Sequence, residues 1–467
     1  PYSVRRQVVA CLPFSLTADQ VAAIDDILGE MAQAHPMNHL LLGDVGTGKT
    51  VVAAFALVCA AANGHQAMMM GPTEVLVSQY ALSLGPILDA CNVGWATVMG
   101  STPRDEKQVA LSQFAEGSIK VLFGTHALLQ PEVVACDCSL VCIDEQQRFG
   151  VEQRQGLAEK APGADILSMT ATPIPRSLAL ARYGGLSLSY LHRPPARQGG
   201  RTTKVCHFSE EGIAYDALRE ALARGEQAYV ICPLIGVDLP KSDSAVHDHE
   251  EESSIEYAAI EWGLEHDEVG DTLSAATKHA EILQSQIVPQ ASVALLHGKM
   301  SPAEKSQVMN SFREGKIDVL VSTTVVEVGV DVPNATVMII EDADRFGLAQ
   351  LHQLRGRVGR GDLPGRVFLV SRSRAPEALE RLGAMEKTED GFALSEMDLS
   401  LRREGDIFGD RQHGKSPLKL TNVVRDKAVI EAAYRDARSV YDDGFLSVDE
   451  RRAVMQELKT IQETRNR

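Results

Sequence analysis

The sequence predicts an α/β protein with two parallel-sheet lobes in tandem, followed by a helical C-terminal region. The chain has 467 residues, enough for about two or three domains of ordinary size. Short aliphatic runs alternate with segments of helical periodicity, which is the pattern of parallel sheets. This alternation begins again after a segment rich in Arg, Pro and Gly at 193–200, and it is absent beyond Ser371. The sequence therefore predicts two similar lobes and then helices.

Composition places the chain among soluble folded proteins, with 44% hydrophobic and 23% charged residues. The longest uncharged apolar stretch, Val51–Ala62, is shorter than the roughly 18 residues that a membrane span requires. No charged leader precedes an apolar segment at the N-terminus. We therefore expect a cytoplasmic protein with no membrane partner. Because the chain begins at Pro1 and not at Met, we also expect that at least one N-terminal domain is missing.

The net charge of −17 argues at first against a nucleic-acid partner, which usually requires a basic surface. However, the acidity is concentrated in one segment. Between Asp238 and Asp271 the chain has twelve Asp or Glu residues and a single Lys. Such a segment is typical of a solvated insertion, which we place at about 238–272. The charge of the remaining chain does not exclude nucleic acid.

Five aliphatic runs predict the strands of the first lobe, and each ends at a distinctive turn. The turns contribute a glycine-rich loop at 43–50, an acidic pair at 144–145 and several threonines. Open parallel sheets bind ligands at the carboxyl ends of their strands, so these turns predict one binding edge. The runs are Leu40–Leu42, Ala67–Met70, Ile119–Phe123, Leu140–Ile143 and Ile166–Met169.

The glycine-rich loop has the full phosphate-loop pattern Gly-x4-Gly-Lys-Thr between an apolar strand and an apolar helix. Glycines let backbone N–H groups converge on phosphates at a helix N-terminus. We expect Lys49 to neutralise the β- and γ-phosphates of ATP and the Thr50 hydroxyl to bind Mg²⁺. The complete set of predicted loop residues is Gly43, Gly46, Thr47, Gly48, Lys49 and Thr50.

The acidic pair Asp144-Glu145 follows the strand Leu140–Ile143. A phosphate-loop hydrolase needs one carboxylate to hold Mg²⁺ and another to orient the attacking water. We assign Asp144 to the metal and Glu145 to the water. Three cysteines lie near this pair without a partner cluster at zinc-ligand spacing, so we expect buried core and no metal cluster from them. They are Cys136, Cys138 and Cys142.

Five further runs predict the strands of the second lobe. Its last strand is preceded by the sequence Gln-Leu-Arg-Gly-Arg-Val-Gly-Arg, which ends at Arg360. Arg355, Arg357 and Arg360 would be costly together in a core, and arginines of one lobe can act on phosphates bound to the other. We choose Arg357 and Arg360 for that role. The runs are Ala228–Cys232, Val293–Leu296, Asp318–Ser322, Thr336–Ile340 and Arg366–Val370.

The phosphate loop, Pro-Thr-Glu-Val-Leu, Gly-Thr-His-Ala-Leu, Asp-Glu-Gln-Gln-Arg, Thr-Ala-Thr-Pro-Ile and the arginine segment occur in the order of superfamily-2 helicase motifs. The amino-acid sequences of these motifs resemble those of the RecG family, and the resemblance extends from about Leu12 to Leu420. The resemblance implies RecA-like lobes at 1–197 and 198–372, a helical hairpin and hook at 373–420, and a C-terminal helical segment at 421–467. It implies an ATP- and Mg²⁺-dependent DNA helicase or translocase on duplex or branched DNA, such as stalled forks and Holliday junctions, in repair and recombination. It also implies a monomer, with a single-stranded DNA-binding protein as a further partner.

The resemblance assigns roles to further residues. Thr17 and Gln20 are similar to the element that reads adenine, while Gln353, Gly329 and Asp331 would sense nucleotide between the lobes. Contacts to the DNA backbone are implied for Thr73, Gly100, Thr125, His126, Thr323 and Thr324; ordinary strand and turn usage remains an alternative for the second-lobe threonines. The coupling hook would use Arg402, Arg403, Arg411, Gln412 and His413.

The chain departs from the family pattern at two places. Gln147 stands where the family usually has His, and an amide cannot carry a proton, so the coupling of hydrolysis to movement is in question. The segment 401–406 replaces a turn richer in glycine and proline. The alternatives are a transcription-repair coupling factor, which shares most of the motifs, and a nucleotide-gated DNA clamp with weak turnover.

Overall fold

The computed structural model describes most of the chain and divides it into two compact units. One unit comprises residues 1–173 and 188–398 and contains both sheets; the other comprises 174–187 and 399–467. Among the described residues, no helix combines the length and apolar character that crossing a bilayer requires. The described residues are 2–146, 149, 156–157, 160–171, 186–192, 200–233, 276–323, 332–361, 363–401, 426–442, 447, 449–450, 452–454 and 456.

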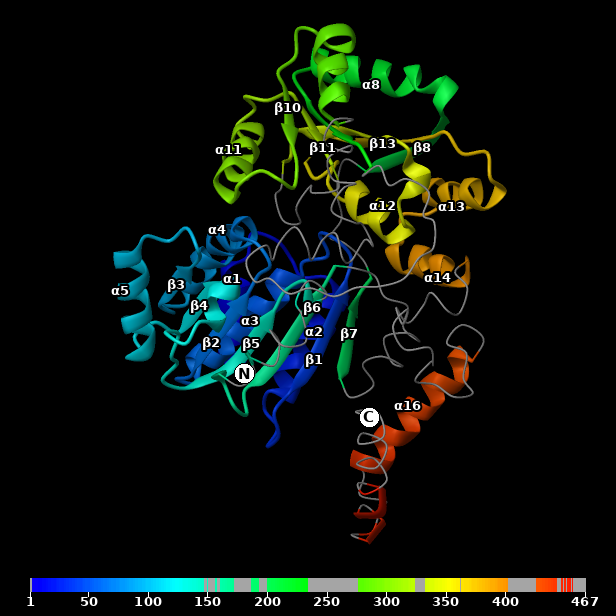
Figure 1. The fold of residues 1–467 in the computed structure, drawn as a ribbon. Helices are drawn as coiled ribbons and strands as arrows, with labels where there is room; N and C mark the ends of the chain where they lie inside the picture. Colours follow the sequence, from blue (N-terminus) through cyan, green and yellow to red (C-terminus); the bar gives the residue numbers. More distant parts are fainter. Residues whose placement is uncertain are drawn as a thin grey trace, which may run out of the picture. The chain divides into compact units, whose positions relative to one another are not determined.

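The first lobe is built on a seven-stranded sheet in the order β3-β4-β2-β5-β6-β1-β7 (Figure 1). Neighbouring strands from β3 to β1 are parallel, so their carboxyl ends lie at one edge. All five predicted strands are confirmed. β3 and β7 were not predicted, because they are short edge strands without a continuous aliphatic run. The strands are β1 Asn38–Gly43, β2 Gln66–Met70, β3 Trp95–Val98, β4 Val121–Gly124, β5 Cys138–Ile143, β6 Asp165–Thr170 and β7 Ser187–Leu191.

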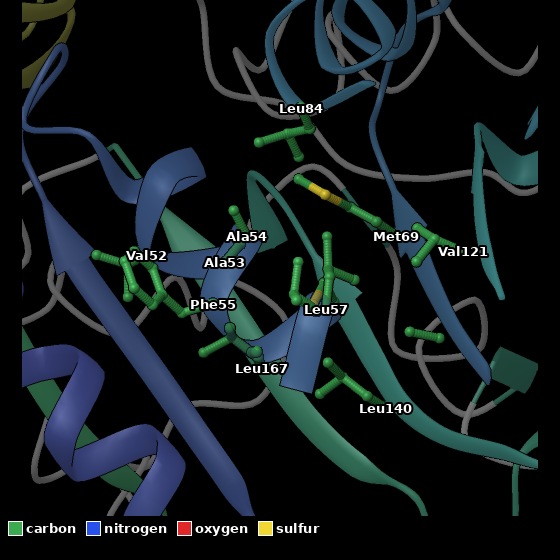
Figure 2. Close-up of a cluster of buried hydrophobic side chains, with 14 of the residues drawn as sticks. Val52, Ala53, Ala54, Phe55, Leu57, Met69, Leu84, Val121, Leu140 and Leu167 are labelled. Carbon is green, nitrogen blue, oxygen red and sulfur yellow. The ribbon is translucent and has the colours of Figure 1, made fainter. Parts of the chain in front are cut away.

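The helix that follows the phosphate loop, α3 (Lys49–Ala62), lies at the centre of the first-lobe core. Every residue from Val52 to Val58 is buried, because the helix is apolar on all sides and packs between the sheet and other helices. Figure 2 shows its side chains beside Met69, Val121 and Leu140. This packing gives the loop at its N-terminus a rigid support. The other helices of the lobe are α1 Tyr2–Cys11, α2 Ala18–Glu30, α4 Glu74–Ala90, α5 Arg104–Ala115 and the 3-10 turn η1 His126–Leu129.

The second lobe contains a six-stranded sheet in the order β10-β11-β9-β12-β13-β8, in which all neighbours are parallel. The five predicted strands are again confirmed. The edge strand β8 was not predicted, because its sequence Arg-Thr-Thr-Lys-Val-Cys-His is mostly polar. The strands are β8 Arg201–His207, β9 Gln227–Ile231, β10 Val293–Leu296, β11 Val319–Ser322, β12 Ala335–Ile340 and β13 Gly365–Ser371.

Helices cover the second sheet and continue beyond it, as predicted. The last strand leads into α13 (Pro376–Lys387), which packs against β8 and α12, and then into α14 (Gly391–Leu401). In the other unit, α16 spans Lys427–Asp442. The remaining helical elements are η3 Phe208–Glu210, α8 Gly212–Ala223, η4 Leu283–Ile287, α11 Pro302–Arg313, η5 Ala343–Arg345 and α12 Leu348–Arg355.

The three neighbouring cysteines do not all lie in the core. Cys142 is buried in β5, but Cys138 is half-buried and Cys136 is exposed. The prediction of buried core is therefore wrong for Cys136. The reason is that this residue precedes β5 in a turn, where its backbone N–H donates to Gln66 Oε1 at 2.7 Å and its side chain faces solvent.

Candidate nucleotide site

The phosphate loop joins β1 to α3 at the carboxyl edge of the first sheet. Gly46 and Gly48 have φ angles of 79° and 84°, in the left-handed region that favours glycine. A Cβ atom at Gly48 would lie 2.3 Å from Nε2 of Gln20, so a larger residue would also displace this amide. The loop runs directly into the N-terminus of α3, where backbone N–H groups and the helix dipole favour an anion.

Lys49 is buried within the loop. Its ammonium group donates to the backbone oxygens of Gly43 at 2.8 Å and Asp44 at 3.1 Å. The Thr47 hydroxyl also donates to the Asp44 oxygen, at 2.8 Å. Burial lowers the pKa of Lys49; the carboxylates of Glu145 and Asp144 oppose this, and Arg360 adds to it. Lys49, Asp144 and Glu145 are all buried, and the loop and the acidic pair follow strands β1 and β5 of the same sheet.

Gln20 connects α2 to the loop. Its Oε1 accepts from the backbone N–H of Thr17 at 2.9 Å, as one half of a capping box, and its Nε2 donates to the Thr47 oxygen at 2.8 Å. Both ends of this buried amide are therefore engaged within the protein. The resemblance suggested adenine reading for Thr17 and Gln20, and the structure adds a positioning contact that the sequence pattern did not indicate.

The acidic pair follows β5 at the same edge. Asp144 accepts through Oδ2 from the Tyr80 hydroxyl at 2.6 Å and through Oδ1 from the backbone N–H of Glu145 at 3.0 Å. Glu145 has a φ of 53°, which is uncommon for a residue with a side chain, and its Oε2 accepts from the Ala171 N–H at 3.4 Å. Burial and the neighbouring Glu145 raise the pKa of Asp144 to about 6, although Lys49 and the Tyr80 hydrogen bond oppose this. The pair is therefore a buried acidic centre beside Lys49.

The three arginines of the second lobe have different surroundings. Arg355, 1% exposed, donates through Nη1 to the backbone oxygens of Met385 at 2.9 Å and Thr388 at 2.8 Å, so it ties α12 to the end of α13. Arg357 is 5% exposed, and Arg360 is half-buried with Nε donating to Gly356 O at 2.8 Å. The backbone acceptors offset the cost of burying Arg355. The positive charge of Arg360 contributes to lowering the pKa of Lys49.

Five of the six residues predicted to contact DNA are among the described residues, and they follow strands at the carboxyl edges of the sheets. Thr73 caps α4 by accepting from the Leu76 N–H at 3.3 Å, and Thr125, which is buried, caps η1 by accepting from the Ala127 N–H at 3.5 Å. Gly100 follows β3, the exposed His126 begins η1, and the buried Thr323 follows β11. Their contact with DNA stays a prediction. Each of the two capping hydroxyls satisfies one backbone N–H group at the start of its helix, and both helix N-termini lie at this edge of the sheet.

Several predicted residues lie outside the described part of the chain. They include Gln147 and the whole acidic segment 238–272. The others are Gly329, Asp331, Thr324, Arg402, Arg403, Arg411, Gln412 and His413.

Three family models match consecutive parts of the chain. They are the DEAD/DEAH box helicase over residues 17–180, the helicase conserved C-terminal domain over 264–362, and domain 3, C-terminal, of ATP-dependent DNA helicase RecG over 388–466. The ATP-dependent DNA helicase RecG of Bacillus subtilis is 41% identical over 452 residues, covering 96% of this chain and 62% of the relative. That of Synechocystis is 41% identical over 430 residues, covering 92% of this chain and 48% of the relative.

Solved structures agree with these relatives. A structure of RecG bound to a three-way DNA junction is similar with a TM-score of 0.72 and 37% identity, covering 92% of this chain and 52% of that chain. The helicase MrfA bound to DNA shares only the fold, with a TM-score of 0.57 and 16% identity over 83% of this chain and 54% of that chain. The chain thus spans about half to three fifths of the length of the curated relatives it matches.

Proposed function

The chain belongs to the RecG family of superfamily-2 helicases, and from this premise we propose that it is the motor of an ATP-dependent DNA helicase or translocase. The observation that carries the proposal is the carboxyl edge of the first sheet, where the loop with the buried Lys49 follows β1 and the buried pair Asp144-Glu145 follows β5. The alternative of a transcription-repair coupling factor is not favoured, because the relatives and the third family model carry the RecG description.

The residues at the loop fit a triphosphate with Mg²⁺. Left-handed glycines and the N-terminus of α3 form an anion cradle, and the Asp144 carboxylate and Thr50 hydroxyl are hard oxygen donors of the kind Mg²⁺ prefers. Tyr80 holds one oxygen of Asp144, so the orientation of this carboxylate is set before any cation binds. When bound, Mg²⁺ would neutralise phosphate charge and orient the terminal phosphate.

The protein groups then have separate tasks. Lys49 exchanges its two backbone acceptors, Gly43 O and Asp44 O, for anionic phosphate oxygens. Glu145, held against the Ala171 N–H, orients the attacking water. Arg357 and Arg360 supply positive charge from the second lobe. Part of the catalytic charge would thus lie on the lobe that moves toward the phosphate loop when ATP is bound. Hydrolysis and lobe movement would thereby be coupled.

Branched DNA is the substrate class that we propose, because the similar RecG structure is described as bound to a three-way DNA junction. Contacts from Thr73, Gly100, Thr125, His126 and Thr323 would bind phosphates without reading bases, which suits recognition of DNA shape. In fork reversal the pairs broken and formed nearly balance, so ATP chiefly supplies direction. A role in repair and recombination, a monomeric state, a cytoplasmic location and a single-stranded DNA-binding protein as partner rest on the family resemblance and form part of the proposal.

The substitution Lys49→Ala tests the proposal. ATP hydrolysis stimulated by a three-way junction should fall by at least about 100-fold, because a charge aimed at the phosphates is lost. Lys120→Ala is the matched control: this lysine also donates to a backbone oxygen, that of Gly64 at 2.7 Å, but lies at the opposite edge of the sheet, before β4. Equal rates for wild type and Lys49→Ala would refute the proposal. Tight ATP-dependent junction binding without phosphate release would instead support the clamp.

A further inference from the structure

The phosphate loop contacts the second lobe through Asp44 and His352. Asp44 is the second residue of the loop, and His352 lies on α12. The ring nitrogen Nε2 is 2.6 Å from Asp44 Oδ1, and the two side chains are 2% and 17% exposed, respectively. Shielding from water reduces the screening of such a pair. A second contact lies beside it: a Cβ atom at Gly356 would be 3.1 Å from Cβ of Val45, the next residue of the loop.

The orientation of the His352 ring is determined by its neighbours. Its Nδ1 is 2.8 Å from Nη2 of Arg355, which in turn is fixed by backbone oxygens at the end of α13. A guanidinium group has only donors, so Nδ1 must accept and the ring proton resides on Nε2, the nitrogen beside Asp44. A Cβ atom at Gly391 would lie 2.5 Å from Nε2, so the ring also fills the space at the start of α14.

Asp44 contacts His352 through its side chain and the ammonium group of Lys49 through its backbone oxygen. Its side chain accepts from the backbone N–H of Val45 at 2.5 Å, so the carboxylate and the loop backbone are held together. Its own backbone oxygen accepts from Lys49 Nζ and from the Thr47 hydroxyl. Burial alone would raise the pKa of Asp44, but His352, the Val45 N–H and Lys49 together lower it, which favours the carboxylate. A movement of His352 therefore changes the position of the groups that hold Lys49.

We propose that His352 is a positioning residue of the nucleotide site, which acts from the second lobe through Asp44 to hold the phosphate loop in its binding conformation. The inference rests on the proposed function and deepens it. It differs from the role of Arg357 and Arg360, because those arginines act on phosphate charge whereas His352 acts on the loop itself. Nucleotide affinity in the first lobe then depends on contact with the second.

The test compares His352→Leu, Asp44→Asn and the double variant. The measurements are kcat and KM for ATP with a saturating three-way junction, and the affinity for a fluorescent ADP without DNA. Each single change should raise KM and weaken ADP binding by about tenfold, with a smaller effect on kcat, because a buried polar partner is lost. The double variant should be no weaker than either single one, since the same contact is broken once. His352→Gln should restore most of the affinity, because its amide supplies both an acceptor and a donor.

The control is His65→Leu. His65 also pairs with an aspartate, with Nδ1 2.7 Å from Asp137 Oδ2, but it precedes β2 at the other edge of the sheet, and its loss should leave KM unchanged. The inference would be overturned if His352→Leu and Asp44→Asn lowered the melting temperature but left KM unchanged. It would also be overturned if the effects of the two single changes on KM multiplied in the double variant. If His352→Leu does not fold, an unchanged KM in Asp44→Asn overturns it alone. Activity in Lys49→Ala would refute the proposed function instead.

Discussion

At the residue scale, the acidic side chain at the end of a central strand in each lobe is held by a buried tyrosine. Tyr80 on α4 donates to Asp144 at 2.6 Å, and Tyr215 on α8 donates to Glu341 at 2.6 Å. Hydrogen bonds to charged acceptors are among the stronger ones in proteins. The two pairs therefore offer matched tests, because only the first one lies at the phosphate loop.

We expect Tyr80→Phe to weaken the affinity for Mg²⁺ and so to raise the Mg²⁺ concentration that ATP hydrolysis requires by about 10- to 100-fold. This is the usual effect of removing a group that orients a metal ligand. The measurement is the Mg²⁺ concentration that gives half the maximal rate. Tyr215→Phe removes the corresponding bond in the second lobe and should lower stability without moving that concentration. Equal Mg²⁺ dependence in wild type and Tyr80→Phe would contradict the positioning role of Tyr80.

Because Glu341 is buried, we expect the stability of the second lobe to depend on pH. Burial raises the pKa of this carboxyl above its ordinary value, with Asp342 adding to the effect and with Tyr215 and Arg372 opposing it. The unfolded chain ionises first as pH rises, so the wild type loses stability from about pH 4.5 up to the folded pKa. Glu341→Gln keeps an acceptor for Tyr215 and avoids the buried charge. Its melting temperature should match the wild type near pH 4.5 and exceed it at pH 8; a lower value at pH 8 would contradict this account.

At the element scale, the start of α14 contacts both lobes. Gly391 packs on His352 of α12, while Phe392 lies against rings at the end of β7, with centroid distances of 5.8 Å to Tyr190 and 5.0 Å to His192. The helix is therefore anchored on the first lobe by aromatic contacts and on the second by close packing.

We expect Gly391→Ala to destabilise the protein by about 1–3 kcal/mol, because the added methyl group would meet the His352 ring at 2.5 Å. Gly383→Ala, in the interior of α13, is the control: no atom lies within 4 Å of a Cβ there, so the higher helix propensity of alanine should stabilise by about 0.5–1 kcal/mol. Denaturant unfolding of both variants measures the difference. Effects of the same sign would contradict the close packing at α14.

At the scale of the whole molecule, the two lobes share the same sheet architecture. Their sheets have corresponding strand orders, with β9 and β12 in the places of β2 and β5. Gln66 begins β2 and donates to the oxygens of Phe114 and Ile119, just as Gln227 begins β9 and donates to those of Phe312 and Ile317. The phosphate loop is not repeated: β8, in the place of β1, leads into Phe208–Glu210. The second lobe therefore keeps the sheet scaffold without the loop at this position.

This asymmetry predicts one nucleotide per chain. Equilibrium titration with ADP should give a stoichiometry of one for the wild type, and Lys49→Ala should remove measurable binding. The pattern Gly-x4-Gly-Lys-Ser also occurs at 409–416, outside the described residues. Binding that persists in Lys49→Ala but is lost in Lys415→Ala would place the nucleotide there and contradict the prediction.

The sequence determined the phosphate loop, the acidic pair and ten of the strands, because each depends on local signals: glycines where φ is positive, carboxylates directly after an apolar run, and buried strands that are continuously aliphatic. It did not indicate β3, β7 or β8, since short or polar edge strands gain their stability from the neighbours they pair with. Tertiary structure alone decided that Tyr80 meets Asp144 and that Asp44 meets His352. These partners lie far apart in sequence, and only the packing of the helices brings them together.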